Sequence, residues 1–146
     1  SEAIVEFLMP VFGEESVKPL PALGVSAQGL NYLNFLLADP IQAVALYRSG
    51  VLVQVPRPER FAIHKLIVAS RRRGGPEEAK ARKDRAQAEF LIRILAQDRP
   101  DDLAEALEHA LAQGLRWRSR IASSLERMPA TKDLLSGMGG AWAIGA

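Results

Sequence analysis

The chain has 146 residues, of which 48% are hydrophobic and 25% charged, which is typical of one globular domain. Cysteine is absent, so disulfides, cysteine-ligated zinc and thiol nucleophiles are excluded. The two histidines, His64 and His109, are too far apart in the sequence to favour a histidine-rich metal site. No apolar run reaches the roughly 20 residues of a membrane span, and no basic leader precedes an apolar stretch. We therefore expect a cytoplasmic protein without a membrane partner.

The net charge of +2 conceals a concentration of basic side chains in the middle of the chain. Residues 1–56 carry a formal charge of −3, residues 57–85 carry +6 and residues 86–146 carry −1. Arginine outnumbers lysine 14 to 5, and its planar guanidinium suits pairing with phosphates and carboxylates. The central run therefore fits an anionic partner, such as a nucleotide, a nucleic acid or an acidic protein face. It equally fits an ordinary solvated helix surface.

The first part of the chain combines strand signals with turn residues. Apolar and β-branched residues at 3–9 predict a strand that is buried on both faces except at one glutamate. Glycines and prolines at 10–27 predict a loop, and the leucine spacing at 28–38 predicts a short helix. Two β-rich runs at 41–48 and 51–56 surround a Ser-Gly pair, which predicts a hairpin.

The second part of the chain has the periodicity and the punctuation of helices. Prolines and acidic residues are placed where the first turns of helices would lie, and glycines or prolines follow the expected ends. We expect four helices and one additional helical turn, at residues 58–73, 77–97, 101–113, 115–128 and 130–135. The sequence thus places most of its helical signal after residue 57.

This order of elements predicts an α+β fold with the strands first. We expect a short N-terminal strand and a hairpin, the remnant of a mixed sheet, followed by a module of about four helices. Residues 1–56 would form the partial sheet region, residues 57–135 the helical module and residues 136–146 a mobile tail.

Three isolated residues are candidates for chemistry, each with a structural alternative. Glu6 is the one acid within an apolar run, so it is either a metal-binding or basic carboxylate or a solvent-facing residue of an edge strand. His64 falls among apolar helix positions and is interpreted as a histidine at the edge of the core. Trp117 lies between two arginines, which allows a cation–π contact, but a core anchor is the favoured interpretation.

The basic run itself offers a polar helix face on which a charged ligand could be oriented. That face contains Lys80, Lys83, Asp84 and Gln87 at helical spacing, and a plain exposed helix would look the same. Aromatic residues do not alternate with the basic ones, so base stacking of the single-strand type is not supported. The sequence also lacks a phosphate-binding glycine loop followed by lysine, a Rossmann glycine pattern and a serine elbow.

Two segments in order give the sequence a specific resemblance. A valine-rich run at 51–55 leads into Pro-Arg-Pro-Glu-Arg-Phe-Ala-Ile-His-Lys-Leu at 56–66, and Lys-Ala-Arg-Lys-Asp-Arg-Ala-Gln-Ala follows at 80–88. These segments resemble the central part of a bacterial nucleotidyltransferase-fold family within the DNA-polymerase-β-like superfamily. The resemblance covers roughly residues 3–128, and shorter similarities occur at 21–25, 39–41 and 98–103.

The resemblance implies nucleotidyl transfer from a nucleoside triphosphate. In that superfamily a Gly-Ser or Gly-Gly turn, an Asp-x-Asp pair and a third carboxylate hold two divalent metals, so a complete enzyme would use Mg²⁺. The residue that resembles the third carboxylate, both catalytic and metal-binding, is Glu6. The helical module would face the nucleotide and bind its phosphates through Lys65, Arg71, Arg72, Lys80, Lys83 and Asp84.

The sequence departs from that family pattern because it contains no Asp-x-Asp pair. We therefore expect a C-terminal portion of a nucleotidyltransferase-like protein, inactive alone because the metal-binding half is missing. The alternative is a non-catalytic arginine-rich module that binds nucleic acid or an acidic protein partner. Unpaired sheet edges would also permit a homodimer. Neither the acceptor nor the preferred nucleotide follows from the sequence.

Overall fold

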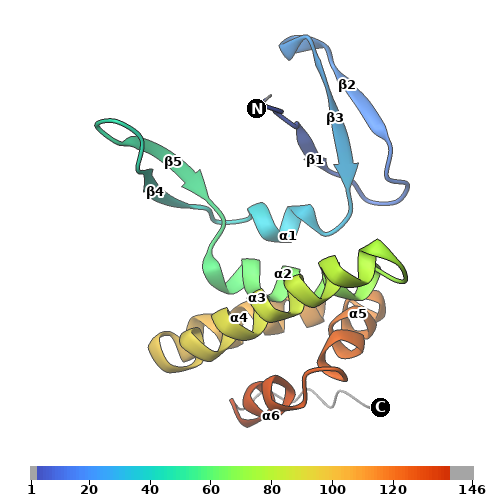
Figure 1. Cartoon of the computed structure of the whole chain (residues 1–146), viewed down its shortest axis with the longest axis vertical. Coiled ribbons are helices and arrows are strands. Elements are labelled where there is room, and N and C mark those ends of the chain that lie inside the picture. Colours follow the sequence, from blue (N-terminus) through green and yellow to red (C-terminus); the bar gives the residue numbers. More distant parts are fainter. Residues whose placement is uncertain (1–2, 139–146) are drawn as a thin grey trace. The chain divides into compact units, whose positions relative to one another are not determined.

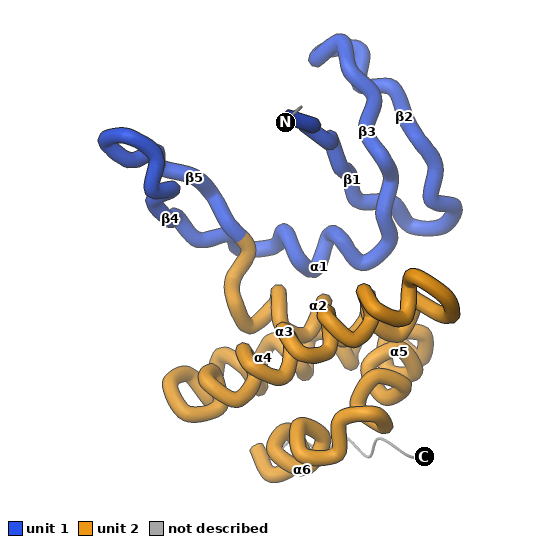
Figure 2. Tube along the Cα trace, viewed as in Figure 1, with its two compact units in different colours: residues 1–55 blue, residues 56–146 orange. Residues whose placement is uncertain are grey.

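The computed structural model describes residues 3–138, which divide into two compact units between Val55 and Pro56 (Figures 1 and 2). The first unit contains the strands and one short helix, and the second unit consists of helices. The chain is therefore an α+β protein with the strands first, which confirms the predicted fold class.

A small mixed sheet begins the first unit. Its strands are β1 (Leu8–Pro10), β2 (Val17–Leu20) and β3 (Val25–Leu30), and a single 3-10 turn, Pro21–Leu23, joins the last two. The order in the sheet is β1-β3-β2, with β1 parallel to β3 and β2 antiparallel to it. Both outer strands thus have one hydrogen-bonded neighbour within the described part of the chain.

The strand predicted at 3–9 is wrong in its position and in its burial. Regular pairing begins at Leu8, and residues 3–8 are all exposed. Apolar and β-branched composition alone predicted a strand with neighbours on both edges. In the structure β3 contacts this segment along one edge, and a Gln28 N–H to Phe7 oxygen hydrogen bond of 2.8 Å marks where the pairing starts.

The loop predicted at 10–27 and the helix predicted at 28–38 also differ from the structure. The supposed loop contains β2 and much of β3, because Pro19 lies on an edge strand, where a missing N–H is tolerated. The supposed helix shrinks to α1 (Leu33–Leu37), because β3 extends through Leu30 and Tyr32 adopts a φ of 70°. The leucine spacing therefore spans the end of a strand, a turn and a short helix.

A hairpin completes the first unit, as the sequence predicts. Strands β4 (Ile41–Ala45) and β5 (Val51–Val55) are antiparallel, with Ile41 opposite Val55 and Ala45 opposite Val51. The turn between them closes with a 2.9 Å hydrogen bond from the Gly50 N–H to the Tyr47 oxygen, and Gly50 has a φ of 92°. The glycine of the Ser-Gly pair is thus used for its backbone conformation.

Up to residue 138, the second unit contains five helices, and prolines define most of their starts. Four of the five begin at proline, whose fixed φ and missing N–H suit the first helical position. The helices are α2 (Pro58–Arg71), α3 (Pro76–Asp98), α4 (Pro100–Ala112), α5 (Leu115–Leu125) and α6 (Pro129–Gly137). The predicted helices are confirmed, and the helical turn expected at 130–135 is a longer helix.

The core of the second unit is formed around α2, which packs against α3, α4 and α5 (Figure 1). Burying each large aliphatic side chain contributes on the order of 2 kcal/mol. All five helices supply fully buried apolar residues to this core: Ile63, Leu66, Ile67, Ile92, Leu103, Ile121, Leu125 and Leu135. None of the helices within residues 3–138 is long and apolar enough to cross a membrane.

The predicted mobile tail falls mostly on residues that the structure does not describe. Its first two residues complete α6, and residues 139–146 lie outside the described range.

Candidate functional site

The basic run of the sequence lies on the hairpin formed by α2 and α3. Gly74 and Gly75 have φ values of 73° and 53°, so glycine supplies the backbone conformation of the tight turn between the two helices. Because the helices run antiparallel, residues late in α2 lie opposite residues early in α3. This arrangement brings side chains of opposite charge together along the helix pair.

The centre of this arrangement is the buried carboxylate of Asp84. Asp84 is 4% exposed, and its Oδ1 accepts a 2.8 Å hydrogen bond from Lys65 Nζ. Its Oδ2 lies 3.1 Å from Arg72 Nε, an ion pair whose angles do not make a hydrogen bond. A buried carboxylate is costly unless it is paired, so Lys65 of α2 and Arg72, the residue directly after α2, stabilise one anion from α3.

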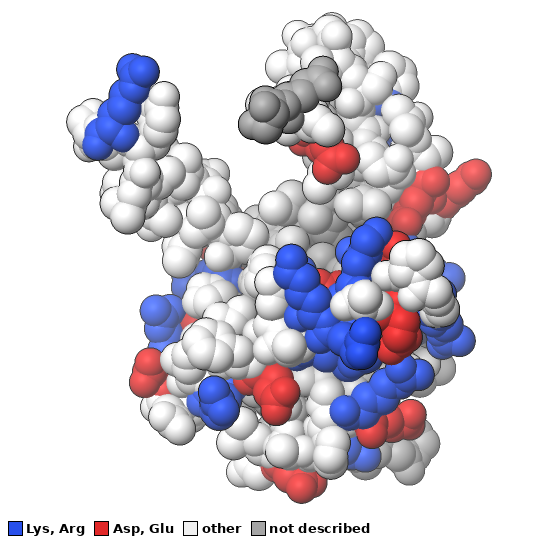
Figure 3. Space-filling view, in the orientation of Figure 1, with Lys and Arg blue, Asp and Glu red and all other residues white. Residues whose placement is uncertain are grey.

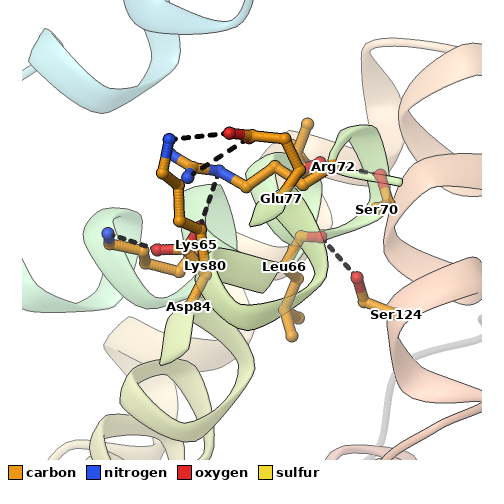
Figure 4. A network of polar contacts seen from close by, with 9 residues as sticks. Lys65, Leu66, Ser70, Arg72, Glu77, Lys80, Asp84 and Ser124 are labelled. Carbon is orange, nitrogen blue, oxygen red and sulfur yellow. Dashed lines mark hydrogen bonds and ion pairs between the residues drawn. The ribbon is translucent and has the colours of Figure 1, made fainter. Parts of the chain in front are cut away.

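A second carboxylate, Glu77, contacts the same group from a more exposed position. Its Oε1 is 2.6 Å from Lys80 Nζ, and its Oε2 is 3.6 Å from Arg72 Nη1. The hydrogen bond from Lys80, aided by the positive charges of Lys80 and Arg72, holds the pKa of Glu77 below its ordinary value. Figure 4 shows the resulting α2–α3 cluster, which consists of Lys65, Arg72, Glu77, Lys80 and Asp84.

The ammonium group of Lys65 is fixed by an aromatic contact as well as by Asp84. Lys65 Nζ lies 5.2 Å from the centroid of the Phe61 ring, within the range of a cation–π interaction. The Lys65 side chain is 21% exposed, and that of Arg72 is 31% exposed. Both cations are therefore held in place and still reach solvent.

His64, next to Lys65 on α2, is partly buried, as expected for a histidine at the edge of the core. Burial, followed by the charges of Lys65 and Arg71, lowers the pKa of His64 from 6.5 to about 4, although Asp84 opposes the shift. The imidazole is therefore neutral near pH 7. It adds no further positive charge to the α2–α3 cluster.

The predicted site residues do not all meet. Lys83 is exposed and points about 100° around α3 from Asp84, so it lies outside the cluster. Arg71 is exposed as well and is the last residue of α2, directly before Arg72 leaves the helix. Glu6 belongs to the first unit and is exposed. Trp117, predicted to anchor the core, is half-buried on α5.

Glu77 is a member of the site, although its sequence position predicts only the start of a helix. The sequence does indicate the contact between Glu77 and Lys80, because residues three apart lie side by side on a helix. The contact with Arg72 could not be predicted in this way, since it joins α3 to the residue that follows α2.

Ion pairs outside the cluster join further residues of the basic run to one another and to arginines later in the chain. Glu78 Oε1 is 3.0 Å from Arg85 Nη2 and 3.2 Å from Arg127 Nη1, and Arg99 Nη1 is 3.2 Å from the buried Glu59. Figure 3 shows acidic and basic side chains side by side on the helical unit. The acidic partners Glu59, Glu77, Glu78 and Asp84 are already counted in the formal charge of +6, so these pairs order part of the basic run without lowering its net charge.

The cluster does not have the donor set of a divalent-metal site. Among residues 3–138, no group of three or more histidine or acidic side chains could hold a metal ion. The carboxylate of Asp84 contacts the side chains of Lys65 and Arg72, which repel a cation. The Mg²⁺ implied by the resemblance therefore does not fit the α2–α3 cluster by itself.

Comparison with known proteins places the cluster inside a recognised segment. A family model described as Nucleotidyltransferase matches residues 1–112, from the start of the chain to the end of α4. No curated protein and no solved structure gives a match. The matched segment includes the whole first unit and every residue of the α2–α3 cluster, whereas α5 and α6 lie beyond it. The chain belongs to this nucleotidyltransferase family.

Proposed function

We propose that this chain provides the phosphate-orienting part of a nucleotidyltransferase. Its α2–α3 cluster would hold the phosphates of a nucleoside triphosphate through Lys65, Arg72 and Lys80. The observation that carries the proposal is that α2, α3 and the connection between them present three cations together, within a segment that matches the family. Guanidinium and ammonium groups are the usual protein partners of phosphate oxygens.

Each residue of the cluster would have a distinct part in this function. Arg72 and Lys80 would bind phosphate oxygens and offset the negative charge of the triphosphate. Lys65, fixed by Asp84 and by the Phe61 ring, would provide a cation in a defined position. Asp84 would act as a positioning residue, since both of its oxygens contact cations of the cluster.

In the complete reaction, an acceptor oxygen would attack the α-phosphorus and form a new phosphate ester, while pyrophosphate leaves with the electrons of the broken bond. Divalent metals supply charge neutralisation in this class of reaction. We propose that Glu6 contributes one carboxylate to such a metal site in a complete enzyme. The sequence contains no Asp-x-Asp pair, so we propose that the chain alone binds nucleotide without turning it over.

Calorimetric titration of the chain with each nucleoside triphosphate in the presence of Mg²⁺ tests the proposal. Lys80→Ala should weaken triphosphate binding by roughly tenfold, the effect of losing one charged phosphate contact. Arg93→Ala is the matched control, because Arg93 is an exposed basic residue on the same helix outside the cluster. Absence of binding by the wild-type chain, or equal losses in both variants, would refute the proposal.

Two further measurements separate the proposal from its alternatives. Incubation with labelled nucleoside triphosphates and Mg²⁺ or Mn²⁺ should give no product. Turnover would show that the chain does not lack the carboxylates that catalysis requires. Titration with duplex DNA over a range of salt concentrations tests the alternative that the chain is a non-catalytic module that binds nucleic acid. Binding that falls steeply with salt, without triphosphate binding, would favour that module instead.

A further inference from the structure

The two carboxylates of the α2–α3 cluster differ in how firmly they are held. Asp84 has 6% of its side chain exposed and contacts two cations, Lys65 and Arg72. Glu77 has 44% of its side chain exposed and contacts Lys80, itself 58% exposed, and Arg72. Exposed ion pairs of this kind contribute little free energy, because water and salt screen both partners. The cluster thus contains one fixed anion and one that can exchange with solvent.

We infer that Glu77 occupies the phosphate position of the cluster in the free protein and that a polyphosphate binds by displacing it, while Asp84 remains in place. This inference rests on the proposed function and adds an autoinhibitory contact to it. The carboxylate of Glu77 spans the two cations, with one oxygen near Lys80 and the other near Arg72. A phosphate group presents oxygens to two cations in the same way.

Displacement of Glu77 is possible without disturbing the packing of the helices. Its side chain is on the first turn of α3 and is not among the buried residues of that helix. Rotation about its side-chain bonds would carry the carboxylate into solvent, where it is well hydrated. Asp84 cannot follow, because it would leave Lys65 and Arg72 without their shared buried anion.

The contact also gives the cluster a preference among anions. Three cations and two carboxylates leave a formal charge of +1 in the free cluster, so an approaching anion competes with Glu77 for Arg72 and Lys80. A triphosphate carries more negative charge than orthophosphate, and when one of its phosphate groups replaces the Glu77 carboxylate, the other groups can reach further cations. We therefore expect polyphosphates to displace Glu77 far more readily than orthophosphate does.

The experiment compares two adjacent glutamates in the full chain. Inorganic tripolyphosphate, orthophosphate and ATP are titrated calorimetrically, with Mg²⁺ present, into wild type, Glu77→Gln and Glu78→Gln. Glu78→Gln is the matched control, because it removes the same charge at the next residue. Glu78 pairs with Arg85 and Arg127 and not with the cluster cations. Glu77→Gln should bind tripolyphosphate and ATP about two- to fivefold more tightly than wild type, and Glu78→Gln should not.

The outcomes distinguish the two proposals. If neither wild type nor Glu77→Gln binds triphosphate, both the proposed function and this inference fail. If wild type binds but Glu77→Gln binds equally or more weakly, or if Glu78→Gln gains as much, the displacement is refuted and the proposed function stands. Carboxyl NMR of the wild-type chain gives a check independent of any variant. Saturating tripolyphosphate should raise the pKa of Glu77 toward its ordinary value, and an unchanged pKa would contradict the inference.

Discussion

Replacing Asp84 by asparagine tests whether its buried charge organises the α2–α3 hairpin. The change keeps the shape of the side chain and removes the anion that Lys65 Nζ contacts at 2.8 Å and Arg72 Nε at 3.1 Å. The two cations then face a neutral amide, which leaves them without a charged partner in this position. We expect Asp84→Asn to destabilise the second unit.

The magnitude follows from the exposure of the partners. Removing one member of a fully buried pair costs about 3–5 kcal/mol, because the remaining charge is stranded away from water. Here the Lys65 and Arg72 side chains are 21% and 31% exposed, so both can regain hydration by small movements. The remaining loss is close to that of a charge-assisted hydrogen bond, about 2 kcal/mol in the free energy of unfolding.

Urea unfolding followed by helical circular dichroism measures this loss. With an m-value of about 2 kcal/mol/M, the midpoint should fall by roughly 1 M while the m-value stays the same. Glu89→Gln, an exposed change on the same helix, should alter the free energy of unfolding by less than about 0.5 kcal/mol. If Asp84→Asn is as stable as this control, the buried carboxylate does not organise the hairpin.

Three other predictions rest on single contacts. Ser124→Ala should destabilise the helical unit by about 1 kcal/mol in urea unfolding, because it removes the buried 2.6 Å hydrogen bond to the Leu66 oxygen. Gly29→Ala should destabilise the sheet by about 1–3 kcal/mol and accelerate amide hydrogen exchange in β3, because the new Cβ would lie 2.6 Å from Val11 Cγ1. His64→Gln should flatten the pH dependence of stability between pH 6.5 and 4. The pKa of His64 is lowered to about 4 in the folded protein, so the unfolded chain binds more protons in this window and wild type loses up to about 3 kcal/mol as the pH falls.

Each of these predictions has a control, which is either an exposed position on the same element or the pH profile of the wild-type chain. Ser119→Ala on α5 and Ser26→Ala on β3 change exposed positions, and both should leave stability nearly unchanged. Equal losses in a variant and its control would remove the assigned contact as the cause. For His64→Gln, a pH profile parallel to that of wild type would show that other groups carry the acid sensitivity.

The helices of the second unit could be predicted because their signals are local. Each proline at a helix start sets its own φ, and acidic residues follow at Glu59, Glu77 and Asp101 where the helix dipole favours them. Apolar spacing within one helix also indicates which face is buried. None of these signals requires knowledge of a distant partner.

The first unit was predicted less well because strands depend on partners that the sequence does not name. The apolar composition of residues 3–9 favoured a buried strand, yet pairing with β3 begins only at Leu8. The segment that forms β3 carries no strong strand signal and is interrupted by Gly29. Only the hairpin of β4 and β5 was recognised, since its two strands are adjacent in the sequence and joined by a short turn.

The composition of the α2–α3 cluster follows from the register of α3 and from the place where α2 ends. Asp84 and Glu77 are seven residues apart on α3, which is nearly two turns, so both carboxylates lie on the same face of that helix. Lys65 reaches Asp84 from α2, whereas Arg72 reaches both carboxylates from the extended residue directly after α2. Lys83 is one residue away from Asp84 and therefore faces elsewhere on α3. Charge density could locate the basic run, but only the pairing of the two helices determines which of its members act together.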